Sequence, residues 1–218
     1  MKNINFDLRF KKLKILASLW FILSLAIAST GCSRHGLSAS SGQCHSRVSK
    51  NLSTIRTVCL VELHNNAIYP QISGDVTDTL YQTLQKKQLF SLSLLRQTDI
   101  TWRNLEIQPD SAYTLEQLLA ARKMLGVDAV LVGTVTSYTP YPHMAMGLQL
   151  KLIDLRDGQV VWAVEQIWDT ADKATEERIK KYFEQQLRPG FSPLGEQLAV
   201  LSSINFIRFV TYDATEAL

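Results

Sequence analysis

The side chains that most often bind metals or act as nucleophiles are few in this sequence and widely spaced. The three cysteines are Cys32, Cys44 and Cys59, and the four histidines are His35, His45, His64 and His143. None of them stands in the C-x-x-C or H-x-x-x-H spacing that zinc sites commonly use. The sequence therefore predicts neither a metal site nor a bound cofactor.

Recognisable catalytic arrangements are also missing from the sequence. Cys59 and His64 lie five residues apart, which is about 17 Å along a strand and too far for a nucleophile and its base. No G-x-S-x-G elbow and no G-K-S/T phosphate loop occurs. Asp154 and Asp157 belong to a tight turn, where aspartate commonly bonds its own backbone. We predict a protein without catalytic residues, and the alternative is an enzyme with an unrecognised site.

The first 31 residues have the layout of a secretory signal. Five basic residues and one acidic residue precede Ile15, and an apolar run extends from Ile15 to Ala28. This run has 14 residues, whereas a membrane-spanning helix needs roughly 20. Small residues then lead to Cys32, as they do at a cleavage site. We expect residues 1–31 to be a cleaved signal peptide, with an uncleaved anchor as the alternative.

Cys32 resembles the lipidated cysteine of the bacterial lipoprotein signal (the lipobox), which becomes the new N-terminus. Ser29 departs from that pattern, which usually has an aliphatic residue at this place. The resemblance implies that Cys32 carries palmitate-type acyl chains, and two or more such chains hold a protein stably on a membrane. In the same family pattern, Ser33 rather than aspartate after the cysteine implies the outer membrane, if the host has one, with the protein facing the periplasm. Ordinary cleavage beside an incidental cysteine is the alternative.

Removal of the signal changes the charge of the protein. The whole chain has 23 basic and 20 acidic residues, and the part after residue 31 has 18 and 19, a net charge of −1. This balance predicts no surface for nucleic acid. Residues 32–54 are rich in serine, glycine and other polar residues and predict a flexible tether with a reach of roughly 25 Å. Cys44 and Cys59 could form a disulfide, or Cys59 is a buried small hydrophobe, which we favour.

Residues 55–218 predict a single α/β domain, a sandwich with a mixed sheet. Periodicity gives the order β-α-β-α-β-β-β-α-α, in which the β-α-β parts favour parallel pairing and the hairpin is antiparallel. Thr114 and Gln117 form a capping-box pattern, and the helix that they open is expected to bury Leu115, Leu118 and Leu119. The expected strands are 55–63, 89–96, 129–135, 146–155 and 159–168, and the expected helices are 72–88, 114–125, 172–187 and 203–217.

Three segments together resemble a group of bacterial envelope lipoproteins. They are the strand that ends near Asn65 and Asn66, the segment Leu125–Val135 with its G-x-D-A pattern, and the segment Leu150–Trp162 with its D-G-x-h-h-W pattern. Over roughly residues 55–187 the chain is similar to CsgG-like secretion lipoproteins, to the N-terminal domain of TolB and to LpoB-like synthase activators. The connection 137–145 is too short for a membrane-spanning hairpin, so the resemblance implies the scaffold and not the pore.

Aromatic residues are the remaining candidates for function. Tyr138 and Tyr141 lie in a proline-rich connection, and Phe206, Phe209 and Tyr212 recur at three-residue spacing on the last helix. We predict that these five residues contact a partner protein, because aromatics are enriched at such surfaces. The alternative is that the last helix simply docks on the sheet. The sequence as a whole predicts a lipid-anchored envelope domain that binds or assembles an unidentified protein, with a subunit of an oligomeric secretion device as an alternative.

Overall fold

The structure is a computed structural model that describes residues 47–48, 52–103, 113–186 and 202–218. The chain separates into two compact units, Met1–Ala39 and Ser40–Leu218, and all described residues belong to the second. Cys32 and Cys44 lie outside the described residues. The signal peptide, the lipidation and the boundaries 1–31, 32–54 and 55–218 therefore stay predictions.

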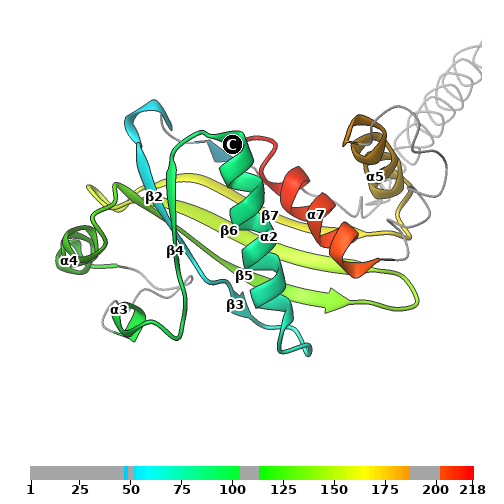
Figure 1. The fold of residues 1–218 in the computed structure, drawn as a ribbon, viewed down its shortest axis with the longest axis horizontal. Helices are drawn as coiled ribbons and strands as arrows, with labels where there is room; N and C mark the ends of the chain where they lie inside the picture. The colour runs from blue at the N-terminus through cyan, green and yellow to red at the C-terminus, as the bar shows by residue number, and fades with distance from the viewer. Residues whose placement is uncertain (1–46, 49–51, 104–112, 187–201) are drawn as a thin grey trace, which may run out of the picture. The chain divides into compact units, whose positions relative to one another are not determined.

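The described unit is a seven-stranded mixed sheet with helices packed on it, which confirms the predicted α/β class (Figure 1). The strands occur in the order β1-β7-β6-β5-β2-β4, and β3 pairs with β5. The elements in chain order are β1 (Arg47–Val48), the 3-10 turn η1 (Leu52–Thr54), β2 (Thr57–Val61), β3 (His64–Asn65), α2 (Ile72–Lys87), β4 (Ser91–Leu95), α3 (Ile100–Arg103), α4 (Leu115–Leu125), β5 (Ala129–Thr139), β6 (Ala145–Asp154), β7 (Val160–Asp169), α5 (Lys173–Gln186) and α7 (Ser203–Ala214).

Strand direction follows the connections, as the sequence predicted. β2 pairs in parallel with β4 and with β5, because helices return the chain between them. β5, β6 and β7 form antiparallel hairpins. Four short elements were not predicted: β1, which pairs with β7, the 3-10 turn η1, β3, which pairs with β5, and α3. β5 also continues four residues further than expected, to Thr139, so the β5–β6 connection is shorter than the sequence indicated.

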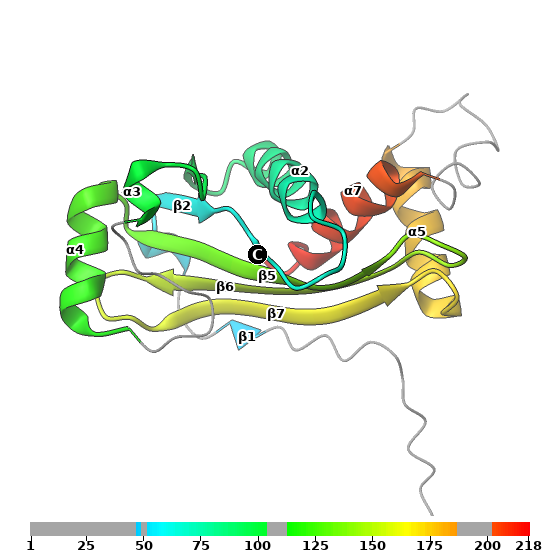
Figure 2. The ribbon, with the colours of Figure 1, turned by 90° about the horizontal axis from the view of Figure 1, so that it is seen from below.

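Helices α2 and α7 lie side by side on one face of the sheet (Figure 2). The α2 stripe Val76, Leu80 and Leu84 is buried, at no more than 1% exposure, in the larger of two hydrophobic clusters. A hydrogen bond of 3.3 Å joins the Thr83 and Thr211 hydroxyls between the two helices. The predicted spacing of four residues therefore places one apolar face of α2 on the core.

Helix α4 packs on the opposite face, and its burial differs from the prediction. The capping box at Thr114 and Gln117 is present, and Gly126 closes the helix in the left-handed conformation at φ 65°. Leu118 and Ala121 are buried, whereas Leu115 and Leu119 are 58% and 48% exposed. The expectation that Leu115 and Leu119 face inward was wrong, because the helix contacts the sheet along a narrow stripe spaced by three residues rather than along a broad face.

Candidate protein-contact surface

The loop before α2 and the β5–β6 connection lie at the end of the sheet where β5 ends. β3 pairs with Thr134 and Val135 of β5, and the amide of Asn66 donates to the Val135 carbonyl at 3.0 Å. The ranges 63–74 and 129–150 contain no aspartate, glutamate, lysine or arginine. These two segments therefore present backbone and uncharged side chains at this end of the sheet.

Asn65 holds the loop before α2 in a fixed shape. Its side-chain amide donates to the carbonyls of Tyr69, at 2.8 Å, and Pro70, at 3.3 Å. Its side-chain oxygen accepts from the amide of Ala67 at 2.9 Å. These bonds close a turn in which asparagine substitutes for backbone partners. The Ile68 side chain is 93% exposed, although these hydrogen bonds restrain the loop that carries it.

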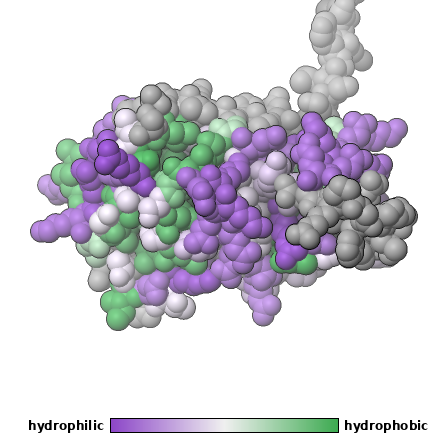
Figure 3. All heavy atoms as spheres, turned by 45° about the horizontal axis from the view of Figure 1, so that its top comes forward, coloured by the Kyte–Doolittle hydropathy of each residue, from purple (hydrophilic) through white to green (hydrophobic). Residues whose placement is uncertain are grey.

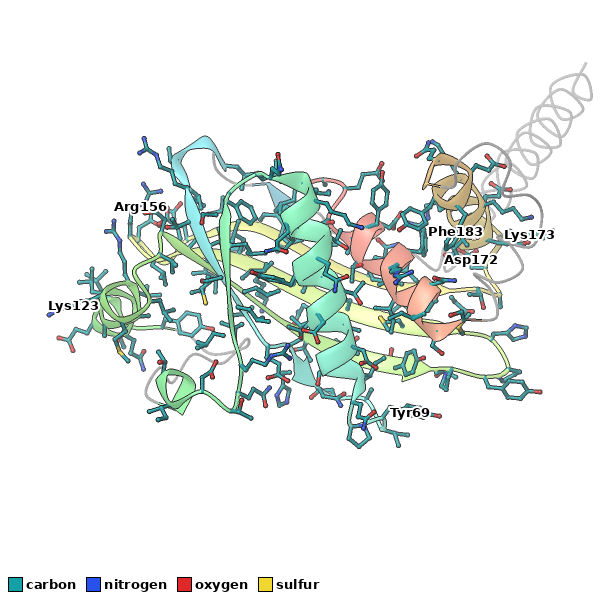
Figure 4. The ribbon with its side chains drawn as sticks, in the orientation of Figure 1. Tyr69, Lys123, Arg156, Asp172, Lys173 and Phe183 are labelled. Carbon is teal, nitrogen blue, oxygen red and sulfur yellow. The ribbon has the colours of Figure 1, made fainter. Side chains whose placement is uncertain are left out.

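Tyr69 connects this loop to β5. Its ring meets the ring of Tyr138 edge to face, with centroids 5.4 Å apart and planes at 81°. Such edge-to-face pairs are a favoured aromatic geometry. Tyr138 is partly buried against the core, and Tyr69 is 45% exposed. Figure 4 shows Tyr69 at the loop before α2, with Arg156 at the other end of the sheet.

Tyr141 lies at the tip of the β5–β6 hairpin. The last paired residues of this hairpin are Thr139 and Ala145, and Tyr141 precedes Pro142 by a cis peptide bond. The Tyr141 side chain is 82% exposed. It stands three residues beyond Tyr138, so the two are at most about 10 Å apart along the backbone. We use the name hairpin-end surface for Ile68, Tyr69, Tyr138 and Tyr141.

The aromatic residues of the last helix are placed differently. Phe206 and Phe209 are each 1% exposed in the main core. Tyr212 is half-buried, and its ring lies 4.8 Å from the ring of Tyr182 on α5. Helix α7 is thus docked on the sheet, the alternative considered from the sequence. Among the five predicted contact residues, the structure brings only Tyr138 and Tyr141 to one end of the sheet, and it leaves Tyr141 the most exposed.

Ile68 and Tyr69 belong to the hairpin-end surface and were not predicted. The composition of their loop gave one indication of an exposed turn. Two asparagines come before Ile68 and Tyr69, a proline comes after them, and no charged residue lies between. Periodicity alone could not reveal that β3 would pair with β5 and bring this loop beside Tyr138. The pairing depends on contacts between residues about 70 positions apart in the chain.

The aspartates of the family-like motifs hold the sheet together at its other end. A side-chain oxygen of Asp128 accepts from the amides of Arg56, at 3.1 Å, and Thr57, at 3.3 Å. The hydrogen bond from the Arg56 amide lowers the pKa of Asp128, whereas burial of the carboxylate raises it. The net effect is a lowered pKa. These bonds fix the start of β2 against the start of β5, so Asp128 has a structural role.

Asp154 has a similar role at the β6–β7 turn. Its carboxylate is fully buried and accepts from the Arg156 guanidinium at 2.7 Å, and the same guanidinium donates to the Thr54 hydroxyl at 3.1 Å. Hydrogen bonding to Asp154 raises the pKa of Arg156. Gly158 completes the turn at φ 71°. The turn is therefore clamped to the segment before β2.

The remaining candidates for chemistry are dispersed. Cys59 is a free, buried thiol in β2, and burial raises its pKa, which disfavours the reactive thiolate. His64 lies in β3, and His143 follows the hairpin tip. Within the described ranges, no group of three or more histidine, cysteine or acidic side chains is placed to hold a metal ion. Across the same ranges, no helix has the length and apolarity to cross a membrane.

Comparison with known proteins gave similar structures only. The sequence matches no protein-family model and no curated protein. The structure is similar to the PelC dodecamer from Paraburkholderia phytofirmans, with 18% identity, a TM-score of 0.43 and coverage of 59% of this chain and 81% of that one. It is also similar to lipoprotein GNA1162 from Neisseria meningitidis, with 15% identity, a TM-score of 0.41 and coverage of 62% and 99%.

A third similar structure is the LpoB C-terminal domain from Salmonella enterica, with 22% identity, a TM-score of 0.39 and coverage of 52% of this chain and 82% of that one. The LpoB-like part of the predicted resemblance thus has a counterpart among the similar structures. The CsgG-like and TolB-like parts stay predictions. Similarities at this level concern the fold, and the proposals below rest on the residues of this chain.

Proposed function

We propose that this protein is a non-catalytic lipoprotein of the bacterial cell envelope, a tethered domain that binds a partner protein through the hairpin-end surface. The observation that carries the proposal is the exposure of Ile68, at 93%, and Tyr141, at 82%, on two loops at one end of the sheet. Large apolar side chains held in water are unfavourable, and clusters of them commonly mark contact sites. Lipidation of Cys32 and the location at the outer membrane, facing the periplasm, are part of the same proposal.

The stiffness of the loops supports a protein contact. The Asn65 hydrogen bonds and the Tyr69–Tyr138 ring pair restrain the surface before any partner arrives. A restrained contact surface loses less conformational entropy on binding than a flexible loop does. Tyrosine also adds a hydroxyl at the rim of each ring, which suits an interface that is part apolar and part wet.

The structural roles of the motif carboxylates support a function without catalysis. Asp128 and Asp154 are engaged in bonds that hold strands and a turn. Cys59 is buried with a raised pKa. The alternative is an enzyme with an unrecognised site. Replacement of His64 and His143 together tests it, because loss of turnover in an activity screen would contradict a function without catalysis.

Site-specific crosslinking in the native envelope tests the proposed surface. A photo-reactive residue placed at Ile68 or Tyr141 is expected to give a discrete adduct, whereas the same residue at the exposed Lys123 of α4 gives none (Figure 4). A second variant, Ile68→Asp, should remove the Tyr141 adduct. Its matched control is Ile100→Asp on α3, since Ile100 is also strongly exposed, at 78%.

Three outcomes would contradict the proposal or redirect it. Equal adducts at Lys123 and Tyr141 would show contact without a preferred surface. An Ile68→Asp protein that crosslinks as well as the Ile100→Asp control would show that the hairpin-end surface is not used. An adduct with twice the mass of the chain would favour the oligomeric secretion device, which light scattering on the fragment from residue 51 would then measure.

A further inference from the structure

Strand β4 ends the sheet, and two hydrogen bonds fix the direction of its backbone groups. The Ser91 amide donates to the Arg56 carbonyl at 2.8 Å, and the Leu95 carbonyl accepts from the Glu62 amide at 2.9 Å. Successive residues of a strand point their backbone groups to opposite sides. Ser91, Ser93 and Leu95 therefore bond to β2, and the amides and carbonyls of Leu92 and Leu94 point away from the sheet.

The outer side of β4 is open among the residues that the structure describes. No described strand pairs with it, and the sheet order ends there. One outward group has a partner, because the Tyr81 hydroxyl of α2 donates to the Leu92 carbonyl at 3.4 Å, near the upper limit for a hydrogen bond. The Leu92 amide and both backbone groups of Leu94 have no hydrogen-bond partner among the described residues, and an incoming strand can bond to them.

β4 lacks the features that usually protect an edge strand. Its sequence is Ser-Leu-Ser-Leu-Leu, with no charged residue and no proline, and all five residues keep an unbroken register with β2. Proteins commonly use charges, prolines or bulges to prevent pairing at such edges. Leu92 and Leu94 are half-buried against the main core, and Ser91 and Ser93 are exposed on the other side. Figure 3 shows apolar surface next to the polar surface on the half of the unit that carries β4.

Charged residues flank both ends of β4, and Arg96, the cation directly after the strand, is paired with Asp78 at 2.5 Å. Arg56 and Lys86, both exposed, lie near its beginning, where the Arg56 carbonyl bonds Ser91. Glu62 and Asp99 lie near its end, where Glu62 bonds the Leu95 carbonyl and the Gln97 amide. A strand laid along β4 would therefore be favoured if it were acidic at one end and basic at the other.

We propose that β4 binds an extended peptide segment of a partner protein by strand addition. The segment alternates apolar side chains, which extend the row of Leu92 and Leu94, with small hydroxyl side chains beside Ser91 and Ser93. Its backbone bonds to the outward groups of Leu92 and Leu94, and the Tyr81 hydroxyl is displaced from the Leu92 carbonyl. Main-chain bonds supply affinity in this mode of recognition, and alternate side chains supply specificity. This site is independent of the hairpin-end surface.

Hydrogen exchange at individual amides tests the proposal on the full-length protein, purified in detergent. The probe is a capped peptide with glutamates at its amino end, alternating threonine and valine in the centre, and lysines at its carboxyl end. Saturating peptide is expected to slow exchange of the Leu92 and Leu94 amides by on the order of tenfold. A control peptide with methylated amides in its centre should have no effect, because it cannot donate to β4.

Two variants separate loss of the outward amide from loss of the side chain. Leu94→Pro removes an amide that makes no bond to β2, and Leu94→Ala removes the side chain and keeps the amide. The peptide should bind about tenfold more weakly to Leu94→Pro than to Leu94→Ala. Equal binding to the two variants, or no protection at Leu92 and Leu94, would overturn the proposal. Protection that appears without peptide and rises with protein concentration would also overturn it, in favour of pairing with a second copy.

Discussion

At the residue scale, two glycines differ in the space around them. A Cβ atom on Gly133 of β5 would overlap the Gln149 carbonyl oxygen and come within 2.6 Å of Leu150, whereas one on Gly74 of α2 would meet nothing within 4 Å. We expect Gly133→Ala to lower the free energy of unfolding by about 2 kcal/mol through overpacking. Gly74→Ala should raise it by about 0.5–1 kcal/mol, because alanine favours a helix. Urea unfolding measures both, and equal effects would contradict the close approach of β5 and β6.

Asp128 predicts how stability depends on pH. Its folded pKa is lowered from about 3.8, chiefly by the Arg56 amide, so its contribution to stability is present above that value. The contribution is lost as the pH falls through the folded pKa, because the unfolded state then binds the proton first. Urea unfolding should show that Asp128→Asn destabilises the protein more at pH 7 than at about pH 3. If the destabilisation by Asp128→Asn were the same at both pH values, the charge of the carboxylate would have no part in holding β2.

At the element scale, helix α7 and the β5–β6 hairpin carry aromatic residues with opposite roles. Phe209 is 1% exposed and Tyr141 is 82% exposed. Phe209→Ala is expected to cost about 3–5 kcal/mol of stability, because it leaves a cavity in the core. Tyr141→Ala should change stability by no more than about 0.5 kcal/mol. A thermal or urea unfolding series compares the two, and a large loss for Tyr141→Ala would assign it to the core instead of a contact surface.

The elements themselves were largely predictable from the sequence. The α2 stripe at Val76, Leu80 and Leu84, the capping box at Thr114 and the direction of the strands follow from local periodicity and side-chain chemistry. Exposure of Leu119 was not predictable in this way. The buried stripe of α4 is narrow because of the sheet surface that the helix contacts. The width of that contact depends on tertiary packing.

The candidate site was predictable only in part, for the same reason. Tyr138 and Tyr141 belong to a segment rich in tyrosine and proline, which made them candidates. Phe206 and Phe209 were candidates because they too are aromatic, and their burial separates them from Tyr141. Ile68 and Tyr69 join the surface through the pairing of β3 with β5, which brings together residues distant in the chain. Local pattern identifies candidate aromatics, and the fold decides which of them reach the surface.

At the scale of the whole molecule, the proposed lipid anchor and the proposed contact surfaces belong to different parts of the chain. The proposed attachment to the membrane is the lipid on Cys32, and the flexible tether of residues 32–54 stays a prediction. The hairpin-end surface and the β4 edge involve different strands of one sheet.

Lipid attachment at Cys32 is the central claim, and metabolic labelling of the bacterial host with radioactive palmitate tests it most directly. The wild-type protein should incorporate label and sediment with membranes. Cys32→Ser should incorporate none and leave the membrane fraction when the signal is processed. A Cys32→Ser protein that stays on the membrane, together with a wild-type protein that never takes up palmitate, would contradict the account and identify a different anchor.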